Sequence, residues 1–307
     1  MKNRSIACII QVALAVIVFF GIASGLCYAS GIAIGEESVT ISFYGEESGV
    51  YYLITDPQGR RTGYDPVSKQ EVEEFPAAFD FSLAVIDGVP KFIRDEQNDL
   101  FHGSADFNLI PGTYTIEVFG VVLTAYDLVI RISRIIPGEG PVRVDIKTVT
   151  PEQIAAIKAR STALEFEGVI DKGLTSKFQF TYTSDPTKPA GTAMKVVTPS
   201  SLKQDIILSR KIGWIDNDGI MQSLLKKVEA MEASIARGNI KTARNQLNAF
   251  INEVNAQKGK HIESYDPTPG YTSPDPATRV RVPSEGKAVK MLLEDAQYLL
   301  STLTEGK

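Results

Sequence analysis

Carboxylates are the side chains of this sequence best suited to chemistry, and they are concentrated in its first third. A first group contains Glu71, Glu73 and Glu74, and a second contains Asp87, Asp95, Glu96, Asp99 and Asp106. Paired carboxylates hydrolyse glycosides and clustered carboxylates bind calcium, although most acidic clusters simply face water. We therefore keep two hypotheses open: a carboxylate-dependent hydrolase, and a calcium site at Asp87, Asp95, Asp99 and Asp106.

Motifs for other kinds of catalysis are missing from the sequence. His102 and Ser104 lie close together in the chain, but this adjacency does not make a catalytic triad, so we interpret them as loop residues. The chain contains no G-x-S-x-G elbow and no glycine-rich phosphate loop. With only two histidines, a His-rich zinc site is not expected, and we interpret His261 as a solvated cation near a helix end. We predict no catalytic and no cofactor-binding residues.

The segment Asp216-Asn217-Asp218-Gly219 has the composition of part of an EF-hand loop. The full loop needs an acid two residues before Asp216 and a glutamate six residues after Gly219, where the sequence has Trp214 and Leu225. We therefore predict that Asp216, Asn217 and Asp218 cap a helix instead.

Composition excludes several classes of protein. The 307 residues are 43% hydrophobic and 22% charged, which is typical of globular chains and not of disordered or multi-span membrane proteins. The formal net charge is −5 and no basic run occurs, so a dedicated nucleic-acid-binding protein is not expected.

The N-terminus has the features of a secretory signal peptide over residues 1–29. Lys2 and Arg4 precede an apolar run from Ile6 to Phe20, and Cys27 and Ala29 provide small residues at positions −3 and −1 of a cleavage site. A retained membrane anchor and a lipid anchor on Cys27 are the alternatives. Cleavage would remove Cys8 and Cys27, and with them any disulfide, thiol nucleophile or Cys-ligated metal. We expect a secreted, periplasmic or extracellular bacterial protein without a transmembrane segment after cleavage.

Alternating apolar residues predict β-strands from about Glu36 to Leu208. One apolar and one polar face per strand is typical of antiparallel sheets packed as a β-sandwich. Turns and a Pro-Gly-rich boundary at 137–141 divide this part into a β-sandwich domain at 36–136 and a second β region at 141–208, packed on or continuing the first. The inward-facing sets are Val39, Ile41, Phe43; Tyr114, Ile116, Val118; Tyr126, Leu128, Ile130, Ile132; Val142, Val144, Ile146; and Phe178, Phe180, Tyr182.

A short helix from Thr150 to about Arg160 is predicted inside the β region, and a helical region follows at 213–307. Apolar residues at helical spacing predict one helix ending at Gly238, an antiparallel second helix ending at Gly259, and a third over about 286–303 capped by Ser284. The proline-rich stretch 264–283 is predicted to be an exposed loop. The expected fold class is mainly β, a jelly-roll-like antiparallel β-sandwich followed by a separate all-α three-helix hairpin bundle.

Part of the helical region resembles a known family. The segments Ala236-Arg237-Gly238-Asn239 and Asn248-Ala249-Phe250-Ile251-Asn252-Glu253-Val254 are similar to the FIMAH-type helical module. This resemblance covers about 70 residues and implies an accessory, non-catalytic module of secreted bacterial and archaeal proteins. The proline-rich insertion before the third helix departs from the family pattern.

A second resemblance concerns the β region. The segment from Ile110 to Val118, with its Pro-Gly-Thr-Tyr start, resembles a strand of jelly-roll-like modules similar to bacterial pre-peptidase C-terminal domains. Together these patterns predict an exported, non-catalytic binding, adhesion or scaffolding protein of the cell envelope, whose partner is an envelope or extracellular protein or a glycan.

Overall fold

The fold is described from a computed structural model of the 307-residue chain. The structure describes residues 32–34, 38–45, 49–80, 83–86, 89–92, 101–134, 142–144, 150, 152, 161–185, 187–262, 265–271, 281–285 and 287–303. Within these ranges the protein is mainly β, with two antiparallel sheets of five and six strands, three two-stranded pairs and four helices.

The two large sheets contain most of the strands. The six-stranded sheet has the order β15-β14-β10-β3-β4-β5, and the five-stranded sheet the order β13-β11-β2-β9-β6. The bounds in the first sheet are β15 Gly191–Val196, β14 Thr175–Tyr182, β10 Gly112–Gly120, β3 Val50–Thr55, β4 Arg61–Asp65 and β5 Gln70–Glu73. Those in the second are β13 Ser161–Ile170, β11 Thr124–Ser133, β2 Ser38–Gly45, β9 Phe101–Phe107 and β6 Ala78–Asp80.

Three shorter antiparallel pairs complete the β structure. β1 (Ile32–Ile34) pairs with β12 (Val142–Val144), and β7 (Leu83–Ile86) pairs with β8 (Val89–Phe92). The third pair, β16 (Tyr265–Tyr271) and β17 (Arg281–Glu285), lies mostly inside the stretch 264–283 that the sequence predicted to be a loop. That prediction is wrong for these residues, and Ser284, the predicted helix cap, belongs to β17.

The alternating residues of the sequence form one core between the two sheets. Four of the five predicted inward sets are buried in this core, in β2, β10, β11 and β14, while the side chains of the fifth, around β12, lie outside the described residues. Phe43 of one sheet stacks on Tyr52 of the other with ring centroids 4.5 Å apart. Phe178 likewise meets Tyr126 edge-on across the core. Alternation therefore predicted these strands and their buried faces correctly.

Strands from both predicted parts of the β region share the two sheets. β13 pairs with β11 in the five-stranded sheet, and β14 pairs with β10 in the six-stranded sheet. Residues 161–196 thus extend the sheets begun by residues 38–133. The predicted short helix after Thr150 lies outside the described residues, apart from Glu152, which is helical.

The three helices predicted in the C-terminal region are present. They are α4 (Asp218–Ala236), α5 (Ile240–Gln257) and α6 (Lys287–Thr302). Asn217 is the N-cap of α4, and Gly238 and Gly259 adopt positive φ just after α4 and α5, as glycine stops require. The apolar stripes are buried at Leu224, Val228 and Met231 in α4, at Ala243, Leu247, Phe250 and Val254 in α5, and at Met291, Leu292, Ala296 and Leu299 in α6.

A fourth helix replaces the end of the predicted β region. Residues Pro199–Lys211 form α3, which begins at the N-cap Thr198 with a reciprocal capping box to Ser201 and carries proline in its first turn. The β prediction for residues 199–208 is therefore wrong. The buried residues of this helix include Leu202, Ile206 and Ser209 at helical spacing, and the Thr-Pro-Ser-Ser start is a helix signal.

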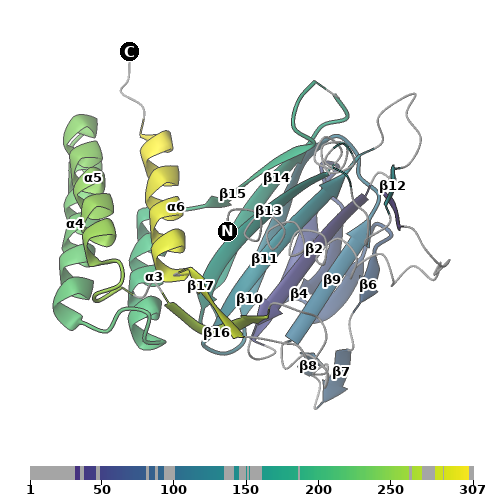
Figure 1. The fold of residues 1–307 in the computed structure, drawn as a ribbon, viewed down its shortest axis with the longest axis horizontal. Helices are drawn as coiled ribbons and strands as arrows, with labels where there is room; N and C mark the ends of the chain where they lie inside the picture. The colour runs from purple at the N-terminus through teal and green to yellow at the C-terminus, as the bar shows by residue number, and fades with distance from the viewer. Residues whose placement is uncertain are drawn as a thin grey trace.

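The helices form two layers beside the sheets (Figure 1). α3 and α6 contact β13, α6 also contacts β15, and the α4–α5 pair packs on their far side. Val169 and Val197 of the β region belong to the same buried cluster as the helix stripes. The β and helical regions, expected to be separate, thus share a core. Among the described residues, no helix combines the length and apolarity needed to cross a membrane.

Candidate functional site at the junction of sheets and helices

Lys195 of β15 lies at the edge of the sheets where α3 and α6 pack. In the β14–β15 register Lys195 pairs with Phe178, and Ala193 pairs with Phe180. Because paired residues of antiparallel strands share a face, Lys195 points to the interior side of the sheet and not to solvent. Its side chain is only 8% exposed.

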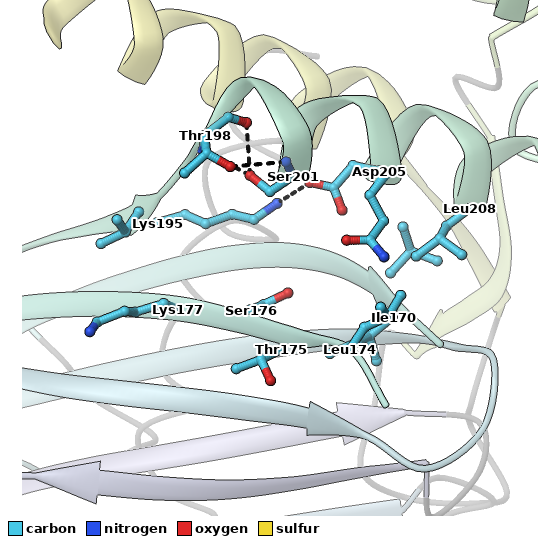
Figure 2. Close-up of a pocket in the computed structure, with 13 residues that line it drawn as sticks. Ile170, Leu174, Thr175, Ser176, Lys177, Lys195, Thr198, Ser201, Asp205 and Leu208 are labelled. Atoms are coloured by element: carbon cyan, nitrogen blue, oxygen red, sulfur yellow. Dashed lines mark hydrogen bonds and ion pairs between the residues drawn. The ribbon is translucent and has the colours of Figure 1, made fainter. Parts of the chain in front are cut away.

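Two aspartates from different helices bind the ammonium group of Lys195. Its Nζ lies 2.7 Å from Oδ2 of Asp205 in α3 and 2.9 Å from Oδ2 of Asp295 in α6, and Figure 2 shows the first of these contacts. The two carboxylates are 6% and 1% exposed. Oδ1 of Asp295 is buried with no hydrogen-bond partner among the described residues. We call these three residues the junction triad.

The charges of the junction triad do not balance if every group is ionised. Two carboxylates and one ammonium would leave a net negative charge in a buried site, which is costly. Burial raises the pKa of Asp295 well above its ordinary value, and nearby Asp205 raises it further. Burial alone would lower the pKa of Lys195, but Asp205 and Asp295 outweigh it and raise that pKa. The raised pKa of Asp295 favours its neutral acid form, which reduces the excess of negative charge around the Lys195 ammonium.

Tyr126 of β11 lies next to the triad and is 1% exposed. Its register partner in β13 is Gly168, and a Cβ atom at Gly168 would lie 2.2 Å from Cζ of the tyrosine ring. Because glycine has no Cβ atom, Gly168 leaves room for the ring of Tyr126. Burial raises the pKa of Tyr126 above its ordinary value, so the phenol stays protonated.

A second charged cluster joins α6 to the five-stranded sheet. Asp127 of β11 and Glu167 of β13 are register partners, and Lys287 of α6 places its Nζ 2.8 Å from Asp127 and 4.0 Å from Glu167. Lys290, one turn further along α6, lies 3.5 Å from Glu167. Burial, together with the like charge of Asp127, raises the pKa of Glu167 to about 8. Directly opposed carboxylates repel each other, and the two lysines offset this repulsion.

A pocket of about 220 Å³ opens beside the junction triad (Figure 2). Lys195 and Asp205 line it, so the triad forms part of its wall. The other polar lining residues carry hydroxyl, amide or ammonium groups: Thr175, Ser176, Lys177, Thr198, Ser201 and Gln204. The apolar lining comes from Val169, Ile170, Leu174, Val196 and Leu208.

The carboxylates singled out in the sequence are only partly covered by the structure. Asp106 lies in β9, where it pairs with Thr40 of β2 and Ala78 of β6, while Asp87, Asp95, Glu96 and Asp99 lie outside the described residues. In the described part of the chain no group of three or more His, Cys, Asp or Glu side chains could hold a metal ion. The calcium hypothesis is therefore not tested at three of its four aspartates.

The remaining predicted positions are ordinary structural ones. His102 and Ser104 are strand residues of β9, register partners of Tyr44 and Ser42, and not loop residues as predicted. His261 follows α5 and places Nδ1 2.9 Å from Oδ1 of Asp216, with both side chains well exposed. Asn217 caps α4 by accepting hydrogen bonds from the backbone N–H of Gly219 and Ile220, as the capping interpretation predicted.

The residues of the junction triad were not singled out from the sequence, although two of them occupy positions that indicate burial. Lys195 occupies an inward register position between Ala193 and Val197, and Asp295 falls in the stripe that contains Leu292, Ala296 and Leu299. A charged residue at a core position of an amphipathic element indicates a buried partner.

Comparisons with protein-family models, curated proteins and solved structures gave no match to this chain. The site is therefore interpreted from its own geometry.

Proposed function

We propose that this is an exported, non-catalytic binding or scaffolding protein of the cell envelope, built as a β-sandwich with a FIMAH-like helical module. The observation that carries the binding role is the pocket between β14, β15 and α3. A concave site with an apolar floor and a few convergent polar groups is the usual form of a ligand site. Export is supported by the features of residues 1–29.

The chemistry of the pocket favours a neutral ligand rich in hydroxyl groups. The positive charge of Lys195 is bonded to Asp205 and Asp295, so it adds little attraction for an anion. Ser176, Thr198 and the other hydroxyl and amide groups can both donate and accept hydrogen bonds. A sugar residue of a glycan or cell-wall polymer has matching groups and an apolar ring face, and we propose this class of ligand.

The test is a binding screen of the protein against glycans, cell-wall polymers and envelope proteins, with and without calcium. The key variant is Gln204→Ala, which removes an amide from the pocket. Gln222→Ala is its matched control, because Gln222 is an exposed glutamine of α4 that does not line the pocket. We expect glycan binding that weakens at least several-fold in Gln204→Ala and is unchanged in Gln222→Ala.

Equal glycan affinities of Gln204→Ala and Gln222→Ala would show that the pocket is not the glycan-binding site. The rival function, a carboxylate-dependent extracellular hydrolase, predicts a different result. In that case the protein would turn over a polymer, and a single Asp or Glu substitution that preserves the fold would abolish the turnover. Such a result would overturn the non-catalytic assignment.

A further inference from the structure

The geometry points to a covalent cross-link: Lys195 of β15 and Asp295 of α6 form an intramolecular amide bond, with Asp205 of α3 as the proton relay. The inference concerns a modification of the protein itself and does not depend on the ligand proposed above. It is carried by three features of the junction triad, namely contact, burial and the arrangement of the two carboxyl groups.

Contact and burial place the reacting groups together away from bulk water. Nζ of Lys195 lies within 2.9 Å of a carboxyl oxygen of each aspartate, and the three side chains are at most 8% exposed. An amine and an acid held in this way react as an intramolecular pair, for which effective concentrations are very high. The enclosure also limits hydrolysis of the product.

The two aspartates are suited to different roles. Asp295 is the more deeply buried, its Oδ1 has no hydrogen-bond partner in the described part of the chain, and burial favours its neutral acid form, whose hydroxyl can leave as water. Asp205 lines the pocket and is bonded to the ammonium group. We therefore assign Asp295 as the carboxyl that acylates the Lys195 amine and Asp205 as the base.

The reaction balances without any co-reactant. The Lys195 ammonium first gives a proton to the Asp205 carboxylate, and this transfer leaves the net charge of the triad unchanged. The free amine then attacks Cγ of Asp295, so that the Nζ–Cγ bond forms. Asp205 donates its proton to the departing hydroxyl as the Cγ–O bond breaks, and it takes back a proton from the nitrogen. The products are the amide, one water and a neutral Asp205 acid.

Burial favours these products, because the amide replaces a buried ammonium group and leaves no ion in the triad. The pocket beside Asp205 and Lys195 gives the released water a route to solvent. The new bond would join residues 100 positions apart and tie α6 covalently to the edge of the six-stranded sheet. A link that closes so long a loop restricts the unfolded chain strongly.

Two other lysine–carboxylate contacts among the described residues are less buried than the junction triad. Lys287 lies 2.8 Å from Asp127, but the Asp127 side chain is 32% exposed. Lys203 lies 2.6 Å from Glu232, and both of those side chains are about a third exposed. We expect no amide at these pairs, and they serve as internal controls.

The experiment is mass spectrometry of the purified full chain under denaturing conditions, followed by peptide mapping. Relative to the mass calculated from the sequence after any N-terminal processing, we expect the wild type to lack one water. Proteolysis should yield a branched peptide that joins the segments of Lys195 and Asp295. Lys195→Arg should have its full calculated mass. Lys287→Arg, the matched control in α6, should still lack one water, as the wild type does.

A wild-type protein that is folded by circular dichroism and has its full calculated mass would overturn the proposal, whatever the variants do. A branch at Asp205 in place of Asp295 would overturn the assignment of the two carboxyl roles. Loss of water at any site other than Lys195 would count against the proposal as well, which is why the peptide map accompanies the intact mass.

Discussion

The core between the two sheets and the junction between sheets and helices are equally buried, but they are built from different chemistry. In the described residues the first is filled mainly by aliphatic and aromatic side chains that interlock across the sheets, such as Phe43 with Tyr52 and Tyr126 with Phe178. The second combines an apolar cluster with Lys195, Asp205, Asp295 and Lys287. The first core needs only complementary shapes, whereas the second also needs its charges neutralised.

This difference affects how each region tolerates change. Apolar packing loses stability in proportion to the volume removed, while a buried charge that loses its partner leaves the other ion without compensation. The junction therefore depends on a few specific residues from β15, α3 and α6, and the sheet core depends on many. Four predictions separate the two regions, in order of decreasing effect.

Replacing Lys195 with methionine is expected to cause the largest loss. The change roughly keeps the length of the side chain but removes the amine, and with it the proposed amide, so that Asp205 and Asp295 are left together in a buried site without their partner. Breaking a buried pair in this way costs about 3–5 kcal/mol, measured as the free energy of unfolding in urea. Lys203→Met is the matched control, because its contact with Glu232 is partly exposed and should contribute less than about 1 kcal/mol. Equal losses of unfolding free energy in Lys195→Met and Lys203→Met would show that the buried and the partly exposed contact contribute equally to stability.

The large aromatic residues of the two cores should give comparable losses. Phe178 in the sheet core and Phe250 in the helical cluster are both fully buried. Substitution of either by alanine should cost about 3–5 kcal/mol through lost burial and the cavity that remains. Because sheets and helices share one junction, we expect each variant to unfold in a single cooperative transition. A two-step transition in which only the helices melt early would show that the regions are energetically separate.

The pH dependence of stability should arise at the junction. The pKa of Glu167, which faces Asp127, Lys287 and Lys290, is raised from 4.5 to about 8 in the folded protein. At pH values between these two pKa values, the unfolded chain has lost this proton and the folded chain still holds it. The free energy of unfolding therefore falls as pH rises, by on the order of 2–4 kcal/mol.

Glu167→Gln should flatten this slope and stabilise the protein at pH 8, as followed by denaturant unfolding at several pH values. The lowered pKa values of Asp65, Asp171 and Asp185 affect stability only in more acidic solution. A wild-type stability that increases between pH 5 and pH 8 would contradict the assignment.

The same comparison explains what the sequence could and could not predict. Alternation identified the inward faces of β2, β10, β11 and β14, and helical spacing with glycine stops identified α4, α5 and α6, because these signals are local. The segment that forms α3 was assigned to the β region, because the alternating pattern was extended to Leu208 and the helix start at Thr198 and Pro199 was missed. The β16–β17 pair is not apparent in a stretch so rich in proline.

The junction triad could not be assembled from the sequence because its partners are far apart. Lys195 is 10 residues from Asp205 and 100 residues from Asp295, so only the fold brings the three together. Charged residues were interpreted as solvated, which is their usual environment. The exceptions appear where a charged residue occupies a core position of an otherwise amphipathic element.

The smallest predicted effect concerns Gly168, where the sheet core meets the junction. An alanine Cβ at this position would lie 2.2 Å from Cζ and 2.6 Å from the hydroxyl oxygen of Tyr126, so the ring would have to move. Overpacking of this kind costs about 1–3 kcal/mol in the wild-type background. In a Tyr126→Ala background the clash is absent, and alanine should even stabilise a strand position held by glycine. A double-mutant cycle by urea unfolding measures this coupling. Equal losses in both backgrounds would show that Gly168 is required for another reason, because only the clash with Tyr126 predicts that the sign of the effect reverses.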